Sequence, residues 1–201
     1  MAKSQKELNA DFRKLKGVVK ELHLDIVDGK FAPNKTLQFP FRLNHNFKYN
    51  VHLMIKNPEK WIKKNWQRVD LVIPHFEELK DVEEYIGWAK SKKKKVVFAI
   101  LPGTNIEKIK KWLPCVDYVL ILTVKPGFYG SKFLPRVLIK VKKIKKINPK
   151  IKIIVDGGMG PETIGQAKKS GADYFVSGSY VTKADKPKQR INKLKKILRE
   201  N

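Results

Sequence analysis

Short apolar runs rich in β-branched residues alternate along this chain with longer amphipathic stretches, and this alternation limits the possible folds more than any other feature. The apolar runs predict strands at 22–27, 49–54, 69–74, 96–101, 116–124, 151–156 and 172–177. The stretches between and after them predict helices near 57–66, 77–92, 104–113, 132–147, 161–170 and 187–199. Strands that alternate with helices predict a parallel sheet, and nearly continuous apolar runs are typical of strands buried on both faces.

Two architectures fit seven such strands. An eighth strand would close the sheet into a compact (β/α)8 barrel, and 201 residues lie at the lower limit of that fold, which takes roughly 200 residues or more. The alternative is an open, doubly wound α/β sheet. No linker, repeat or low-complexity segment interrupts residues 1–201, so we expect a single domain.

The chain is strongly basic, with 44 Lys+Arg against 19 Asp+Glu and a formal net charge of +25. Thirty-eight of these cations are lysines, and many lie at helical spacing opposite an apolar stripe, as in 137–147. This pattern indicates solvated helix faces. A positive field also favours weak, non-specific and salt-sensitive attraction to nucleic acid, but the shortage of arginine argues against base readout.

The single cysteine, Cys115, excludes an internal disulfide and fits a reducing compartment. Because no base is placed beside it, we expect a buried, inert thiol. The first twenty residues contain no apolar signal segment, and no apolar stretch approaches the roughly 20 residues that span a bilayer. We therefore expect a soluble, cytoplasmic protein that does not contact membranes.

Titratable side chains gather at the carboxyl ends of three predicted strands. His23 and Asp25 lie two positions apart and therefore point to one face of their strand, His52 lies in the next strand, and Asp156 ends a later one. In a barrel these strand ends meet at the face where catalysis takes place. Two imidazoles and two carboxylates that converge there predict a divalent-metal site with nitrogen and oxygen ligands.

Glycine-rich segments follow three strands, at 126–130, 156–158 and 177–179. Glycine lets backbone N–H groups approach an anion closely, and the exits of the last two strands are the common phosphate position in barrels. Since glycines also serve ordinary turns, the pattern is informative mainly because it recurs on the last strands of one chain.

Several of these segments together resemble the ribulose-phosphate 3-epimerase family. The matching segments are HLDIVDGKFAPN at 23–34, HLM at 52–54, LPGT at 101–104, TVKPGFYGSKF at 123–133, VDGG at 155–158 and VSGS at 176–179. With a further match, NADF at 9–12, they occur in family order from about residue 8 to the end of the last strand. The resemblance implies a (β/α)8 barrel and an isomerase of the pentose phosphate pathway that interconverts D-ribulose 5-phosphate and D-xylulose 5-phosphate.

The resemblance also implies roles for individual residues. His23, Asp25, His52 and Asp156 would hold one divalent metal ion, with Asp25 and Asp156 as the acid/base pair. Residues implied to bind the substrate and its phosphate are His52, Gly127, Phe128, Tyr129, Gly130, Gly157, Gly158, Gly178 and Ser179. Mixed His/Asp sites accept Zn²⁺, Fe²⁺, Mn²⁺ or Co²⁺, so the sequence does not identify the metal. Family members commonly form homo-oligomers.

The chain departs from the family pattern at its start. The stretch from Gln5 to Leu8 stands where the family has its first strand, with Lys6 in place of a serine, and it is poor strand material. Formation of the first strand, and with it closure of the barrel, is therefore left open by the sequence, and we expect a shortened first helix. His75, at the end of the fourth family strand, is expected to line the site, and His45 to be an ordinary surface residue.

Two other functions remain open. The same chemistry could act on a ketohexose phosphate such as allulose 6-phosphate, and Tyr129, which replaces a small glycine, could mark that change. Alternatively, a catalytically inactive basic barrel could bind nucleic acid or a protein, although such a protein has no chemical reason to keep His23, Asp25, His52 and Asp156.

Overall fold

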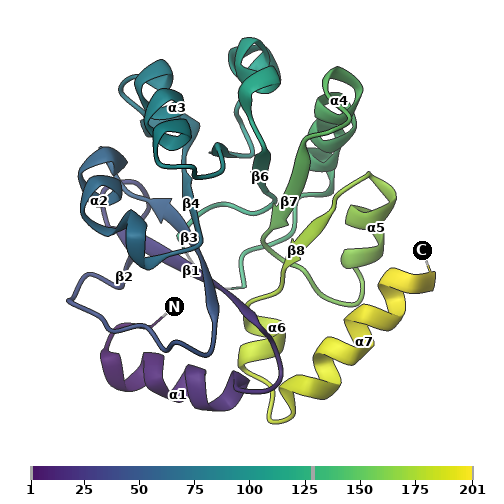
Figure 1. Ribbon diagram of the computed structural model, residues 1–201. Helices are drawn as coiled ribbons and strands as arrows, with labels where there is room; N and C mark the ends of the chain where they lie inside the picture. The colour runs from purple at the N-terminus through teal and green to yellow at the C-terminus, as the bar shows by residue number, and fades with distance from the viewer. Residues whose placement is uncertain (1, 128–129, 201) are drawn as a thin grey trace.

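The structure is a computed structural model that describes residues 2–127 and 130–200. All seven predicted strands are confirmed, together with a short additional one (Figure 1). The parallel strands are β1 (Glu21–Asp28), β3 (Lys48–Met54), β4 (Leu71–Pro74), β5 (Val97–Ile100), β6 (Tyr118–Leu122), β7 (Lys152–Asp156) and β8 (Tyr174–Val176).

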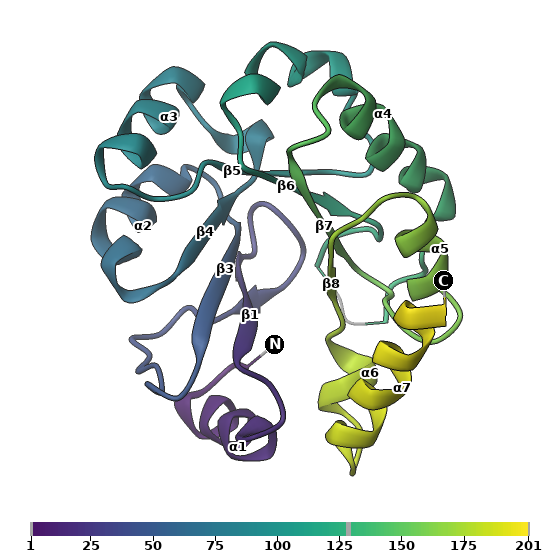
Figure 2. The ribbon, with the colours of Figure 1, turned by 45° about the vertical axis from the view of Figure 1, so that its right-hand side comes forward.

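These strands form two sheets that curve toward each other, ordered β2-β1-β3-β4 and β5-β6-β7-β8. A single parallel bridge between His75 and Ala99 joins the two sheets in the described part of the chain. The additional strand β2 (Lys35–Thr36) pairs antiparallel with the end of β1. Helices surround the sheets on the outside: α2 (Pro58–Asn65), α3 (Val82–Ser91), α4 (Ile139–Ile147), α5 (Ile164–Lys169) and α7 (Pro187–Glu200) (Figures 1 and 2).

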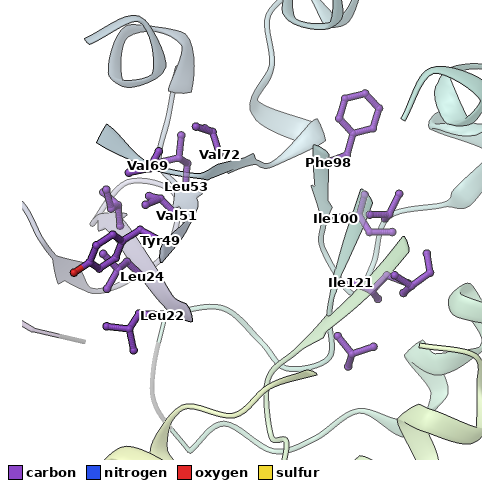
Figure 3. Packing of buried hydrophobic residues seen from close by; sticks show 14 of the residues in the cluster. Leu22, Leu24, Tyr49, Val51, Leu53, Val69, Val72, Phe98, Ile100 and Ile121 are labelled. Carbon is purple, nitrogen blue, oxygen red and sulfur yellow. The ribbon is translucent and has the colours of Figure 1, made fainter. Parts of the chain in front are cut away.

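Alternate residues of β4, β5, β6 and β7 enter two different apolar layers. The larger layer packs between strands and helices and contains Leu24, Val51, Phe98 and Ile121 (Figure 3). The smaller layer has the opposite parity and consists of Ile73, Val97, Ala99, Leu120, Leu122 and Ile154. Because side chains alternate between the faces of a strand, residues of this second parity point into the barrel.

The segment at which formation of the first strand was left open is helical, so no strand forms there. Helix α1 (Gln5–Leu15) begins after Ser4, whose side chain accepts a hydrogen bond from the Glu7 backbone N–H. Its apolar residues recur at helical spacing, and Leu8, Phe12 and Leu15 are buried. A capped segment with this period forms a helix more readily than a strand because it can bury one face.

As a result, the described strands do not close into a complete ring. Strands β1 and β8 are the neighbours that an eighth strand would join, and no pairing links them in the residues that the structure describes. In Figure 2, α1 lies below β1 on one side of this seam, and α6 and α7 lie below β8 on the other side. Lys14 of α1 crosses it at one end and donates a hydrogen bond to the Thr182 carbonyl in α6 (Ser179–Thr182) at 2.7 Å.

Two local predictions need correction. The segment 104–113 forms the 3-10 helices Ile106–Lys108 and Lys110–Cys115, with Pro114 inside the second, and not an α-helix. Proline lacks the N–H that an α-helix interior requires. Cys115, the last residue of the second 3-10 helix, is exposed, so the prediction that its thiol is buried was wrong. None of the described helices is long and apolar enough to cross a membrane.

Candidate active site and metal centre

The register of three strands brings four predicted site residues together. His23 and Asp25 of β1 have the parity that points into the barrel, and Asp25 lies opposite His52 of β3 in the parallel ladder. Asp156 is the last residue of β7. One donor atom from each of the four residues lies within 4.8 Å of every other donor atom. The predicted convergence of these side chains is therefore observed.

Four close contacts define the cluster. His52 Nδ1 lies 3.3 Å from Asp25 Oδ1 and 3.4 Å from Asp156 Oδ2. His23 Nε2 lies 3.5 Å from Asp25 Oδ1 and 3.6 Å from Asp156 Oδ2. The His52 side chain is completely buried, whereas the other three side chains are partly exposed. Each imidazole thus faces both carboxylates.

These four separations fit those between the ligands of a tetrahedral cation. Donors about 2.0–2.2 Å from a tetrahedral ion lie about 3.3–3.6 Å from one another. Three buried atoms of the cluster lack a hydrogen-bond partner within the described chain: His23 Nε2, Asp25 Oδ1 and His52 Nδ1. Since buried polar atoms are normally satisfied, orphaned atoms that face one point fit a bound cation. The four residues therefore suit a divalent metal ion.

Neighbouring charges shift the protonation of the cluster. Burial raises the pKa of Asp25, but the close contacts with His23 and His52 and the charge of these imidazoles outweigh burial and hold that pKa far below its usual range. Burial alone would lower the pKa of His52. The close contacts of its Nδ1 with Asp156 and Asp25, at 3.4 and 3.3 Å, and the negative charge of these carboxylates instead raise the pKa of His52 to about 9. Without a cation, a proton on His52 balances the carboxylates.

A cation must displace this proton, and we expect metal binding to depend on pH accordingly. Below the His52 pKa of about 9 the proton competes with the metal, so the apparent Zn²⁺ affinity should rise about tenfold per pH unit between pH 6 and 8 and level off near pH 9. Calorimetric titration with Zn²⁺ at pH 7, in two buffers of different ionisation enthalpy, should show release of about one proton. An affinity that does not change with pH would contradict this charge arrangement.

The glycine-rich strand exits line the same hollow as the cluster. One cavity of about 1080 Å³ is bounded by His23, Asp25, Asp156, Gly127, Gly130, Gly157, Gly158, Gly178 and Ser179. The same cavity continues along the open seam to Glu21 and Tyr174, which are the first residues of β1 and β8 and so lie at the amino ends of these strands. Two predicted substrate contacts, Phe128 and Tyr129, lie outside the described residues. The described glycines of the predicted set and Ser179 line this cavity, whereas His52 is completely buried and does not line it.

Contacts behind the cluster were not anticipated from the sequence. The Thr36 hydroxyl in β2 donates to the Asp25 carbonyl at 2.6 Å and accepts from the Val27 N–H at 3.2 Å, which fixes the end of β1. His75, predicted to line the site, is fully buried behind His52. Glu77, two residues further on, contacts His75. A His-x-Glu spacing at a strand end was the available signal for this pair.

Comparisons with known proteins agree with this fold and site. Residues 2–182 match the Ribulose-phosphate 3 epimerase family. The ribulose-phosphate 3-epimerase of Candida glabrata is 34% identical over 89% of this chain and 81% of its own length. That of Aquifex aeolicus is 32% identical over 92% of this chain and 87% of its own. Both relatives span most of the chain.

Solved structures share the architecture at low sequence identity. KGPDC from Streptococcus mutans superposes with a TM-score of 0.69 at 13% identity over 97% of this chain and 92% of its own. The tryptophan synthase alpha-subunit from Pyrococcus furiosus gives a TM-score of 0.62 at 17% identity, over 97% of this chain and 91% of its own. These likenesses show the fold alone.

Parallel strands that curve into a barrel, with carboxylates and imidazoles at their carboxyl ends, define an α/β enzyme of the (β/α)8 class. The chain belongs to the ribulose-phosphate 3-epimerase family. The resemblance that the sequence motifs predicted is thereby confirmed, as is the prediction of an isomerase of that family.

Proposed function

We propose that this protein inverts C3 of a ketopentose phosphate, converting D-ribulose 5-phosphate to D-xylulose 5-phosphate through Asp25 and Asp156. One observation carries the proposal. Two carboxylates from β1 and β7, strands that are distant in sequence, converge on two imidazoles, and both carboxylates line the cavity. The family membership of the chain supports the same reaction.

Epimerisation next to a carbonyl needs two proton transfers on opposite faces of one carbon. A base removes the C3 proton to leave a planar enediolate, and an acid returns a proton to the other face. Asp25 and Asp156 come from separate strands, and each directs one oxygen toward the imidazoles. The second oxygen of each carboxylate is then available for proton transfer. Because the two groups are coupled, their apparent pKa values belong to the pair.

The histidines keep these carboxylates in place. His23 and His52 each lie 3.3–3.6 Å from both, so rotation of either carboxylate breaks contacts to both imidazoles. With Asp25 and Asp156 they would hold the divalent ion, whose Lewis acidity lowers the energy of a developing oxyanion. Zn²⁺, Fe²⁺, Mn²⁺ and Co²⁺ all suit this ligand set.

The glycines would hold the phosphate away from the reacting carbon. Gly157 and Gly158 follow Asp156 directly, both with positive φ (109° and 67°), and Gly178 precedes α6. Their backbone lines the cavity beside Lys125, which adds positive charge. Binding energy from a remote phosphate can be directed to positioning of the sugar. We expect Gly127 and Gly130, and their neighbours Phe128 and Tyr129, to take part.

A coupled assay for xylulose 5-phosphate tests the proposal directly. Purified protein loaded with Zn²⁺, Fe²⁺, Mn²⁺ or Co²⁺ should convert ribulose 5-phosphate, and chelator treatment should remove the activity, which the same metal should restore. No turnover from folded protein with any of the four metals would reject the proposal. Micromolar RNA binding at physiological salt in such a protein would instead support the inactive, nucleic-acid-binding alternative.

A six-carbon substrate is the second candidate, because the cavity extends along the open seam and exceeds the space that a pentose phosphate needs. Comparison of kcat/KM for ribulose 5-phosphate and allulose 6-phosphate separates the two. A homo-oligomeric state and a cytoplasmic location also remain predictions; a rice relative, 35% identical, is named a cytoplasmic isoform.

A further inference from the structure

A chain of hydrogen bonds leads from the metal cluster into the protein through two histidines to one carboxylate. His52 Nε2, on the side of the ring away from the cluster, lies 2.9 Å from His75 Nε2. His75 Nδ1 lies 3.1 Å from Glu77 Oε2. Both histidines are completely buried, and the two rings stack with centroids 4.9 Å apart. The centroid of the Phe31 ring lies 4.5 Å from that of His75.

We propose that Glu77, acting through His75, is a positioning residue that fixes the tautomer of His52 and so presents the Nδ1 lone pair of His52 to the metal. The proposal rests on the proposed metal-dependent function only in assuming a cation at the four-atom cluster. It assigns a role to residues that touch neither substrate nor metal.

The tautomers follow from counting donors and acceptors. Glu77 is surrounded by donors: its Oε1 accepts from the Leu101 N–H at 2.9 Å and from the Thr104 hydroxyl, which leaves Oε2 to accept from His75. An ionised carboxylate only accepts, so His75 Nδ1 carries the proton. In a neutral His75 ring, Nε2 then carries no proton and can accept a hydrogen bond.

Because His75 Nε2 carries no proton, it determines which ring nitrogen of His52 is protonated. Two ring nitrogens 2.9 Å apart share one proton, so His52 Nε2 must donate to His75. A neutral His52 with a proton on Nε2 has a free lone pair on Nδ1, and this is the orphaned atom that faces Asp25 and Asp156. One proton arrangement thus satisfies every contact from Glu77 to the cluster.

Lys140 supports the charged form of Glu77. Its ammonium group donates to the carbonyls of Leu101 (3.0 Å) and Thr104 (2.6 Å), the two residues that also donate to Glu77. The positive charge of Lys140 interacts favourably with Glu77. Histidine ligands of metals are commonly oriented by such partners, and removal of the partner typically costs about 10–100-fold in metal affinity.

The variant Glu77→Gln tests the relay, because glutamine offers one acceptor oxygen where the three surrounding donors need two. We expect the affinity for Zn²⁺, measured by chelator competition, to fall about 10–100-fold. The matched control is Glu78→Gln, the adjacent acid, which pairs with Lys56 outside the cluster and should bind Zn²⁺ as the wild type does. Unchanged Zn²⁺ affinity in a folded Glu77→Gln protein would overturn the proposal.

A spectroscopic measurement distinguishes tautomer control from general support of the fold. In the Zn²⁺-loaded wild type, histidine ¹⁵N–¹H NMR should place the protons on His75 Nδ1 and His52 Nε2, and Glu77→Gln should shift or remove the His75 Nδ1–H signal. A wild-type proton on His75 Nε2, or a wild-type chain that does not bind Zn²⁺, refutes the relay even if the variant fails to fold. Zn²⁺ binding with these tautomers but without epimerase turnover would refute only the proposed function.

Discussion

Asp25→Asn and Asp156→Asn should each reduce kcat for ribulose 5-phosphate epimerisation by about 10³–10⁴-fold, the upper part of the range that general acid–base groups contribute. An amide keeps nearly the same shape but cannot act as a general acid or base at neutral pH. Each substitution also removes one anionic donor from the cluster, so metal content must be measured beside turnover. Single-turnover assays in excess metal then separate lost proton transfer from lost metal.

The matched control for both variants is Asp185→Asn, an exposed carboxylate in the segment before α7. It should retain wild-type turnover and metal content. Near-native thermal unfolding curves of all three variants would show that the fold is intact. Substantial epimerase activity in metal-loaded Asp25→Asn or Asp156→Asn would exclude the two-carboxylate mechanism.

Gly157→Ala should have the largest effect on stability among single-methyl additions at the site. Gly157 has φ of 109°, which side-chain-bearing residues rarely adopt, and an added Cβ would lie 2.6 Å from Val124 Cγ2. Backbone strain of about 1–2 kcal/mol and overpacking of about 1–3 kcal/mol together predict a loss of about 2–4 kcal/mol. For a chain of this size that loss lowers Tm by roughly 5–15 °C.

Calorimetry or circular dichroism measures this shift, with Gly103→Ala as the control. Gly103 lies in a turn after β5 with no positive φ, and an added Cβ there would meet no atom within 4 Å. The control should barely change Tm. Because Gly157 adjoins Asp156, Gly157→Ala should also lose turnover at temperatures where it stays folded. Equal Tm values for the two variants would contradict the close packing described here.

The strands and the cluster could be predicted from the sequence because both depend on short-range rules. Apolar runs such as 96–101 and 151–156 must be buried wherever they lie, and residues two apart, such as His23 and Asp25, must share a face. The secondary structure at the start of the chain was harder to predict. Its poor strand propensity was visible, but the choice of helix depended on whether Leu8, Phe12 and Leu15 would find a common apolar surface to cover.

The relay behind the site shows what sequence reasoning lacked. His75 and Glu77 are two residues apart in the sequence, but their partners His52, Leu101 and Thr104 come from other elements. Contacts of this kind depend on strand register and on the turn after each strand, which no local pattern specifies. Strand spacing and family motifs supplied the four cluster residues and the glycines, whereas the contacts of Thr36 and Lys140 emerged only from the packed structure.

By itself, then, the sequence determined the parallel α/β class, the residues able to bind a divalent cation and the family, because periodicity and motif chemistry are local properties. The tertiary structure decided the separations of about 3.3–3.6 Å within the cluster, the helical start of the chain and the open seam between β1 and β8. These depend on how distant segments compete for the same apolar surface and the same hydrogen-bond partners, and that competition is settled only when the whole chain packs.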